Sequence, residues 1–338
     1  MGDAIQGVYG PRRGRCVALV ALLMSSGLLL GGAGPAQKRA QPFRIGALTA
    51  SWGPTTPPII ALRDGLLALG YREGEQFELG VRFTQGNLAA LPAAARALVQ
   101  YGVDLIFVSG DEETKAAQRA TSQIPIVFAS VNDPLGSGLV QSFARPGGNI
   151  TGIAHLSIEL GPKRLQVFKE LIPGLQRVLL PYAAADTSIV AVVQGYRDAA
   201  HHLGIALVEQ VVHTEEEAQA TLAAVRKGEV DGILSPDSIA LNLAGFVLEA
   251  SAKQAIPSMF SSAFWAEQGG LASYGPDLYD SGRQAVRLVD KILHGAKPAE
   301  LPVEVNNKIE VVINLKTAQT LGLTIAPEVL FQANRLLR

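Results

Sequence analysis

Hydroxyl, carboxylate and aromatic side chains gather in loops that follow short apolar runs of this 338-residue chain. Hydroxyls and the free N–H groups at helix starts can bind a carboxylate, carboxylates can bind an ammonium group, and rings can stack on a planar ligand. The loops are Thr49–Pro54, Ser109–Asp111, Ser130–Asp133, Tyr182–Thr187, Ser235–Ser238 and Ser261–Trp265. We therefore expect these loops to bind a small molecule.

The loops of the first half supply several candidate ligand contacts. Ser51 and Trp52 follow the first apolar run, and Trp52 either stacks on a ligand or anchors its Pro-rich loop. Ser109 and Gly110 end another run just before a predicted helix, where a hydroxyl and backbone N–H groups suit a carboxylate. Capping of that helix explains Asp111 without a ligand.

The segment Ser130–Asp133 ends the fourth predicted strand and precedes Pro134. Ser130 and Asn132 are candidate ligand contacts at this strand end. Asp133 either pairs with a ligand ammonium or fixes a turn through its own side chain.

In the second half, Tyr182 and Phe264 are candidates for an aromatic pocket, the alternative being burial beneath segments that cross between lobes. Asp237 either binds a ligand amine or caps the next helix.

Residue patterns typical of catalysis or cofactor binding are missing from the sequence. The five histidines have no metal-ligand spacing, and no Gly-x-Ser-x-Gly nucleophile motif occurs. Gly136-Ser137-Gly138 lacks the Lys-Ser/Thr ending of a phosphate loop. The single cysteine, Cys16, forms no internal disulfide. We expect a binding protein with no catalytic residue, metal or cofactor. An exported hydrolase or nucleotide enzyme is the competing class.

Short β-rich runs alternate with helical patterns from Phe43 onward, which predicts βαβ units and parallel sheets covered on both faces. Two such series flank the glycine- and proline-rich stretch Asp133–Gly152. The expected fold is α/β, with two doubly wound parallel-sheet lobes joined by crossing hinge segments. The expected first lobe is 43–132 plus 277–300, and the second is 133–276 plus 301–338.

The N-terminus predicts export. Arg12, Arg13 and Arg15 precede the uncharged apolar run Val17–Leu30, and small residues follow up to Ala36. This order is typical of a signal peptide over residues 1–36, and the run is shorter than a membrane span requires; an uncleaved anchor is the alternative. A formal net charge of -1 gives no electrostatic reason to bind nucleic acid.

Five segments in the same order resemble one known family. They are Leu66–Gly74 (LLALGYREG), Ile124–Gly152 (IPIVFASVNDPLGSGLVQSFARPGGNITG), Gly269–Gly275 (GGLASYG), Ile292–Pro302 (ILHGAKPAELP) and Val312–Thr324 (VINLKTAQTLGLT). From Phe43 to its end, the chain is similar to the ABC-transporter substrate-binding proteins described as tryptophan/tyrosine transport binding proteins.

The resemblance implies a type I periplasmic binding fold with three interlobe crossings, an amino-acid-like and often aromatic ligand, and no catalysis. With the signal peptide, we expect a periplasmic monomer that delivers its ligand to permease subunits of an ABC transporter. A sensory subunit that delivers the ligand to a membrane receptor is the alternative. The Pro-rich loop around Trp52 and the YAAADT loop from Tyr182 depart from the family pattern, which affects the identity of the ligand.

Overall fold

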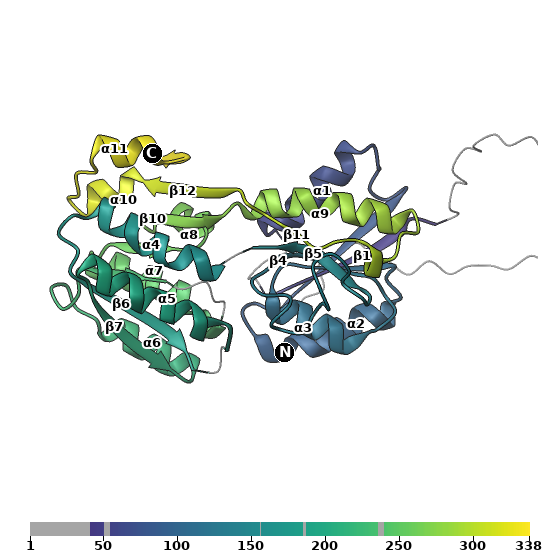
Figure 1. Cartoon of the computed structure of the whole chain (residues 1–338), viewed down its shortest axis with the longest axis horizontal. Helices are drawn as coiled ribbons and strands as arrows, with labels where there is room; N and C mark the ends of the chain where they lie inside the picture. The colour runs from purple at the N-terminus through teal and green to yellow at the C-terminus, as the bar shows by residue number, and fades with distance from the viewer. Residues whose placement is uncertain (1–40, 51–54, 156, 185–186, 236–239) are drawn as a thin grey trace, which may run out of the picture.

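The computed structural model describes residues 41–50, 55–155, 157–184, 187–235 and 240–338. The chain forms two α/β lobes that lie next to each other (Figure 1). Each lobe has its own sheet with helices on both faces, and the chain passes between the lobes three times.

The first lobe is built on a six-stranded, fully parallel sheet with the order β11-β5-β4-β3-β1-β2. Its strands are β1 (Phe43–Thr49), β2 (Phe77–Phe83), β3 (Leu105–Val108), β4 (Ile126–Val131), β5 (Ile150–Ala154) and β11 (Glu304–Val305). Its helices are α1 (Pro57–Ala68), α2 (Leu91–Tyr101), α3 (Asp111–Ala120) and α9 (Leu278–Leu293), with 3-10 turns η1 (Leu88–Ala90) and η3 (Pro298–Glu300).

The second lobe has a seven-stranded sheet with the order β13-β12-β10-β9-β8-β6-β7. Its strands are β6 (Arg177–Ala183), β7 (Ala206–Val212), β8 (Gly232–Leu234), β9 (Ser258–Phe260), β10 (Ala272–Pro276), β12 (Ile309–Asn314) and β13 (Arg335–Leu337). Its helices are α4 (Ser157–Leu171), α5 (Thr187–Leu203), α6 (Glu215–Ala224), α7 (Leu243–Gln254), α8 (Ala263–Glu267), α10 (Leu315–Thr320) and α11 (Pro327–Gln332), with the 3-10 turn η2 (Ala240–Asn242). Only the β10–β12 pair among these strands is antiparallel, because β12 enters from the other lobe.

Alternating side chains of each strand pack into two aliphatic layers, one on each face of the sheet. In the first lobe, Ile45 and Phe107 pack against α1 and α9, whereas Leu48 and Val108 pack against α2 and α3. The second sheet is covered in the same way by α4 and α5 on one face and by α6 and α7 on the other. Among the described residues, no helix has both the length and the apolar character of a membrane span.

Two lobe boundaries differ from those expected from the sequence. The expected first crossing at Asp133 is instead a loop within the first lobe, because Ile150–Ala154 forms the fully buried strand β5 beside β4. The chain crosses only after Ala154. The return crossing also lies later than the expected residue 301, since Leu301 is buried in the first lobe and β11 pairs with β5. The crossings therefore follow β5, β10 and β11.

Helices α1 and α9 lie close together because glycines stand at their contact. A Cβ atom added to Gly282 in α9 would lie 2.4 Å from the backbone oxygen of Pro58, and one added to Gly65 in α1 would lie 2.4 Å from Val286. The Pro58 oxygen belongs to the backbone, and a backbone atom cannot move aside as the end of a flexible side chain can. Because Gly282 has no side chain, α9 can approach α1 closely at this point.

We predict that Gly282→Ala lowers the stability of the protein by about 1–3 kcal/mol, because the added methyl group overpacks the contact with Pro58. The better helix propensity of alanine offsets only part of this loss. The matched control is Gly174→Ala, where an added Cβ has no heavy atom within 4 Å. Urea denaturation of both variants measures the difference, and equal midpoints would contradict this account of the packing.

Candidate ligand-binding site

Polar side chains stand at the carboxyl ends of the first sheet's strands, where open α/β sheets bind their ligands. Thr49 ends β1, and its hydroxyl lies 3.0 Å from that of Ser109, which follows β3. Ser130 lies in β4, Asn132 follows that strand, and His155 follows β5. The sequence-predicted residues Ser109, Gly110, Ser130 and Asn132 thus lie along one sheet edge.

A chain of hydrogen bonds joins the ends of β4 and β5 to the start of α3. The amide nitrogen of Asn132 donates to Asp111 over 2.8 Å, which leaves the amide oxygen 2.6 Å from Nε2 of His155. With this assignment Nε2 carries the proton, and Nδ1 accepts from Ser130 over 2.9 Å. The N-cap of α3 is Gly110 and not Asp111, whose carboxylate instead fixes the orientation of Asn132.

His155 is a site residue that the sequence analysis did not single out. It is 4% exposed and lies directly after the buried strand β5. A polar residue immediately following an apolar strand was the available signal, because that position falls at the sheet edge.

Two other predicted contacts, Asp133 and Tyr182, form hydrogen bonds within their own lobes. Asp133 is exposed, and its carboxylate accepts from the backbone N–H of Gly136 over 2.7 Å, which is the turn interaction considered as its alternative. The hydroxyl of Tyr182 donates to Glu209 on β7 over 2.9 Å. Because Glu209 pairs with Leu180, the Tyr182 ring leans back from the carboxyl end of β6. Ser51, Trp52 and Asp237 lie outside the described residues.

Phe264 lines a cavity of about 360 Å³ between the lobes. The first lobe contributes the starts of α1 and α9, and the second contributes α8 and the strands β12 and β13. The lining residues are Pro57, Ile60, Ser262, Ala263, Phe264, Glu267, Pro276, Asp277, Leu278, Tyr279, Glu310 and Arg335. This volume lies within the range of small-molecule sites. Ile60, Phe264 and Tyr279 are each more than a third exposed, so apolar surface from both lobes faces the cavity.

Carboxylates predominate among the charged groups of this cavity. Glu267 forms an ion pair with Arg335 at 2.5 Å, and Glu310 lies 3.7 Å from the same guanidinium. Burial, together with the charge of Asp277, raises the pKa of Glu310. Burial also opposes ionisation of Asp277, but hydrogen bonds from Lys308 and the Asp280 backbone hold the pKa of Asp277 below its ordinary value.

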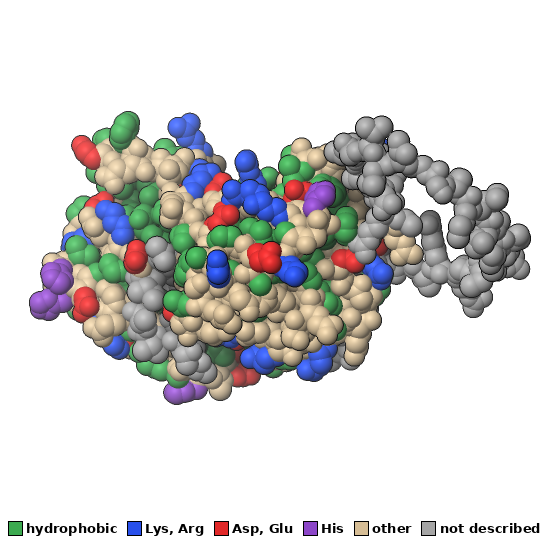
Figure 2. Space-filling model, turned by 45° about the vertical axis from the view of Figure 1, so that its right-hand side comes forward, with side chains coloured by type: hydrophobic (Ala, Val, Ile, Leu, Met, Phe, Trp, Pro, Cys, Tyr) green, Lys and Arg blue, Asp and Glu red, His purple; other side chains and the backbone are tan. Residues whose placement is uncertain are grey.

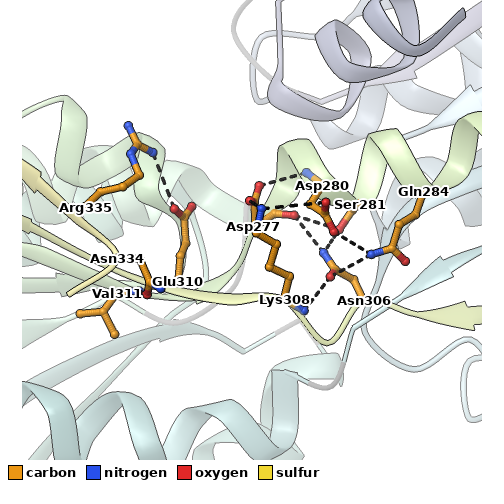
Figure 3. A network of polar contacts seen from close by, with 10 residues as sticks. All are labelled: Asp277, Asp280, Ser281, Gln284, Asn306, Lys308, Glu310, Val311, Asn334 and Arg335. Atoms are coloured by element: carbon orange, nitrogen blue, oxygen red, sulfur yellow. Dashed lines mark hydrogen bonds and ion pairs between the residues drawn. The ribbon is translucent and has the colours of Figure 1, made fainter. Parts of the chain in front are cut away.

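The three crossings meet at one buried residue, Asn306, which is 2% exposed (Figure 3). Its backbone N–H donates to Ala154 at the first crossing over 2.8 Å. Its amide nitrogen donates to the carbonyl of Asp277 at the second crossing over 2.9 Å and to Ser281 in α9 over 2.8 Å. Its amide oxygen accepts from the Lys308 backbone, within the third crossing, over 2.8 Å. The three crossings, which together form the hinge between the lobes, are therefore joined into a single hydrogen-bonded unit.

A second buried polar group, Glu113, lies in the first turn of α3 and is 3% exposed. One carboxyl oxygen accepts from the Ala50 N–H over 2.8 Å, and the other has no hydrogen-bond partner among the residues that the structure describes. Burial raises the pKa of Glu113 to about 7, and the neighbouring charges of Asp111 and Glu112 add to that shift.

The described residues include no group of three or more His, Cys, Asp or Glu side chains placed to hold a metal ion. Acidic and basic side chains are interspersed on the face shown in Figure 2.

We predict that Asn306→Ala destabilises the protein by about 1–3 kcal/mol, because it leaves buried hinge groups without their partner. Asn334→Ala is the control, since Asn334 is exposed and bonds only to Val311 within the second lobe. Urea denaturation compares stabilities, and small-angle X-ray scattering should show a broader spread of lobe orientations for Asn306→Ala alone. A loss no larger than that of the control would contradict the hinge role.

We predict that Glu113→Gln removes a pH-dependent loss of stability. A carboxyl with a raised native pKa stabilises the fold fully below its unfolded pKa, and that contribution falls as the pH rises through the native value. Between its ordinary pKa of 4.5 and about 7, wild type should therefore lose about 3 kcal/mol relative to Glu113→Gln. Urea denaturation at pH 4.5, 6 and 8 measures this, and parallel pH profiles would refute it.

Comparison with known proteins places these features in a family. The model of the family described as ABC transporter substrate binding protein matches residues 59–337. The tyrosine-binding protein of Clostridioides difficile strain R20291 is 27% identical over 256 residues, which are 75% of this chain and 73% of that protein.

Two solved structures share the arrangement of the lobes. An ABC domain from Streptococcus pneumoniae in complex with L-Trp is 27% identical, with a TM-score of 0.78 over 88% of this chain and all of that chain. A conserved domain protein from Vibrio cholerae O1 biovar El Tor is 29% identical, with a TM-score of 0.77 over the same shares. The expected two-lobed fold is confirmed, as is the expected role in solute capture for an ABC transporter. The chain belongs to the family of ABC transporter substrate-binding proteins.

Proposed function

We propose that the protein binds one small amino acid with an aromatic side chain between its lobes and delivers it, as an exported periplasmic monomer, to the permease subunits of an ABC transporter. The observation that carries the choice of ligand is the interlobe cavity, where Phe264 and Tyr279 from opposite lobes face the same space beside carboxylates. The similar proteins whose names mention tyrosine and L-Trp support the same class of ligand.

The geometry suits capture by closure of the hinge. A ligand stabilises a closed state only through contacts that both lobes make together, since contacts with one lobe are equally available when the lobes are open. Ile60 and Tyr279 reach the cavity from the first lobe and Phe264 from the second. Asn306 holds the crossings together while the lobes rotate. Closure then buries the ring of the ligand between aromatic and aliphatic side chains.

Thermal denaturation with L-tyrosine, L-tryptophan and L-phenylalanine, and with L-alanine for comparison, tests the proposal. A ligand that binds only the folded protein at a hundredfold excess over its dissociation constant adds about 2.7 kcal/mol of stability. We expect at least one aromatic amino acid to raise the melting temperature while L-alanine does not. No shift with any of the three would refute this ligand class.

Phe264→Ala should weaken binding of the aromatic amino acid about tenfold, which corresponds to about 1.4 kcal/mol of lost contact. The unliganded melting temperature should change little, because Phe264 is 43% exposed. Phe331→Ala is the matched control, since Phe331 is 91% exposed on α11 and does not line the cavity. Isothermal titration calorimetry gives the dissociation constants, and equal affinities for both variants would remove Phe264 from the site.

A further inference from the structure

The carboxyl group of Glu113 reaches from α3 to the edge of the sheet at which ligands are expected. Glu113 is the third residue of α3, whose N-cap is Gly110. The side chain folds back over the helix start, so that Oε1 accepts from Ala50, the residue after β1. The carboxyl group therefore joins the ends of β1 and β3, the two central strands that pair with each other.

The second oxygen, Oε2, lies against Gly110. A Cβ atom on Gly110 would stand 2.7 Å from Oε2, so a side chain at that position would require the carboxylate to move. Gly110 is itself partly exposed at the strand end, which places Oε2 directly beneath this part of the edge. Within the described part of the chain Oε2 has no hydrogen-bond partner, although Glu113 is only 3% exposed. A buried carboxylate oxygen without a partner costs free energy that a bound donor would recover.

Among the described residues, the charged groups that act on Glu113 are Asp111 and Glu112 of its own helix, and both disfavour its ionised form. The residue after β1, Ala50, donates its backbone N–H to Glu113. His155 is the titratable group at the ends of β4 and β5, and it bonds to Ser130 and Asn132. A cation beside Oε2 would therefore supply the charge that this position lacks.

We propose that Glu113 binds the ammonium group of the ligand through Oε2, at the strand edge between Ala50 and Gly110. This inference rests on the proposed function, because it assigns one group of an amino-acid ligand to one side chain. Ala50, Gly110 and Glu113 do not line the interlobe cavity, so the ligand would have to reach beyond that cavity to the strand edge. The ammonium donates a hydrogen bond to Oε2, and Oε1 keeps its bond from Ala50. The absence of a side chain at Gly110 leaves this space to the carboxylate as it stands.

Release of a proton on binding is the distinguishing consequence. Burial raises the pKa of Glu113 to about 7 in the free protein, and a bound ammonium lowers it because opposite charge favours the ionised carboxylate. The proton leaves to solvent as the ligand enters. The dissociation constant should consequently rise as the pH falls, by up to about tenfold for each pH unit below about 7.

Isothermal titration calorimetry with L-tryptophan and L-tyrosine in phosphate and in Tris measures this proton, because the two buffers differ in their heats of ionisation. For wild type we expect release of about half a proton per ligand at pH 7, rising toward one at pH 6. Indole-3-propionate, which lacks the ammonium group, should release none. These wild-type measurements test the inference even if a substituted protein fails to fold.

Glu113→Gln should release no proton and should bind L-tryptophan with the same affinity at pH 6 and 7. Glu112→Gln is the matched control on the same helix, since Glu112 pairs with Lys115 at 2.8 Å and is substantially exposed. It should still release a proton, though somewhat less at pH 7 than wild type, because loss of the Glu112 charge lowers the pKa of Glu113 slightly. A pH dependence that persists in Glu113→Gln would assign the titration to another group, such as His155, and would overturn the inference.

The outcomes separate this inference from the proposed function. Wild type that binds an aromatic amino acid without proton release overturns the role of Glu113 alone. Wild type that binds none of them overturns the ligand class and the role of Glu113 together.

Discussion

The arrangement of the two lobes depends on the hydrogen bonds that Asn306 makes to all three crossings. Its backbone reaches Ala154, while its amide reaches Asp277 and the backbone of Lys308. An amide suits this position because it donates and accepts from one small group, and nearly all of it is withdrawn from water. Three independent connections would allow the lobes to slide and twist separately. Joined at one point, they favour rotation about a common hinge, which keeps the cavity walls aligned.

The ionisable groups near this hinge and at the sheet edge contrast with the aliphatic cores. Glu113 and Glu310 stand where burial raises the pKa of both carboxyl groups. Such groups are costly in a free protein and serve where a charge must be recognised. The cores around Phe107 and Leu180 carry the stability of the lobes. Stability and recognition are thus assigned to different parts of each lobe.

The alternation of strands and helices was enough to predict two doubly wound lobes, because periodicity and apolar runs are local properties of the chain. Which sheet a strand joins is not local. The stretch after Asp133 is rich in turn residues, but β5 returns to pair with β4, and Gly152 lies so close to Phe128 that an added Cβ would be 2.1 Å from its carbonyl oxygen. Composition indicates a turn there and does not distinguish a loop from a crossing.

The part of the candidate site that lies at strand ends could be predicted, because strand ends can be located from the sequence. Ser109, Gly110, Ser130 and Asn132 follow from position alone. The orientation of Tyr182 depends on its bond to Glu209, and the role of Asn306 depends on residues far away in the sequence. Glu113 resembles any acidic residue in a helix's first turn, where carboxylates are common. Its burial against Ala50 becomes visible only in three dimensions. The roles of Ser51, Trp52 and Asp237 remain predictions.

The path of β12 and β13 has a consequence for biosynthesis. These strands complete the second lobe's sheet, yet they are translated after α9 and β11 of the first lobe. A nascent chain that has emerged as far as Pro276 holds β10 with one edge unpaired, and it lacks Ile313 and Val329, which fill the same core. An open strand edge invites pairing with other chains. The first lobe is complete only when β11 has emerged and the second only when β13 has emerged, so the second lobe begins before the first is finished.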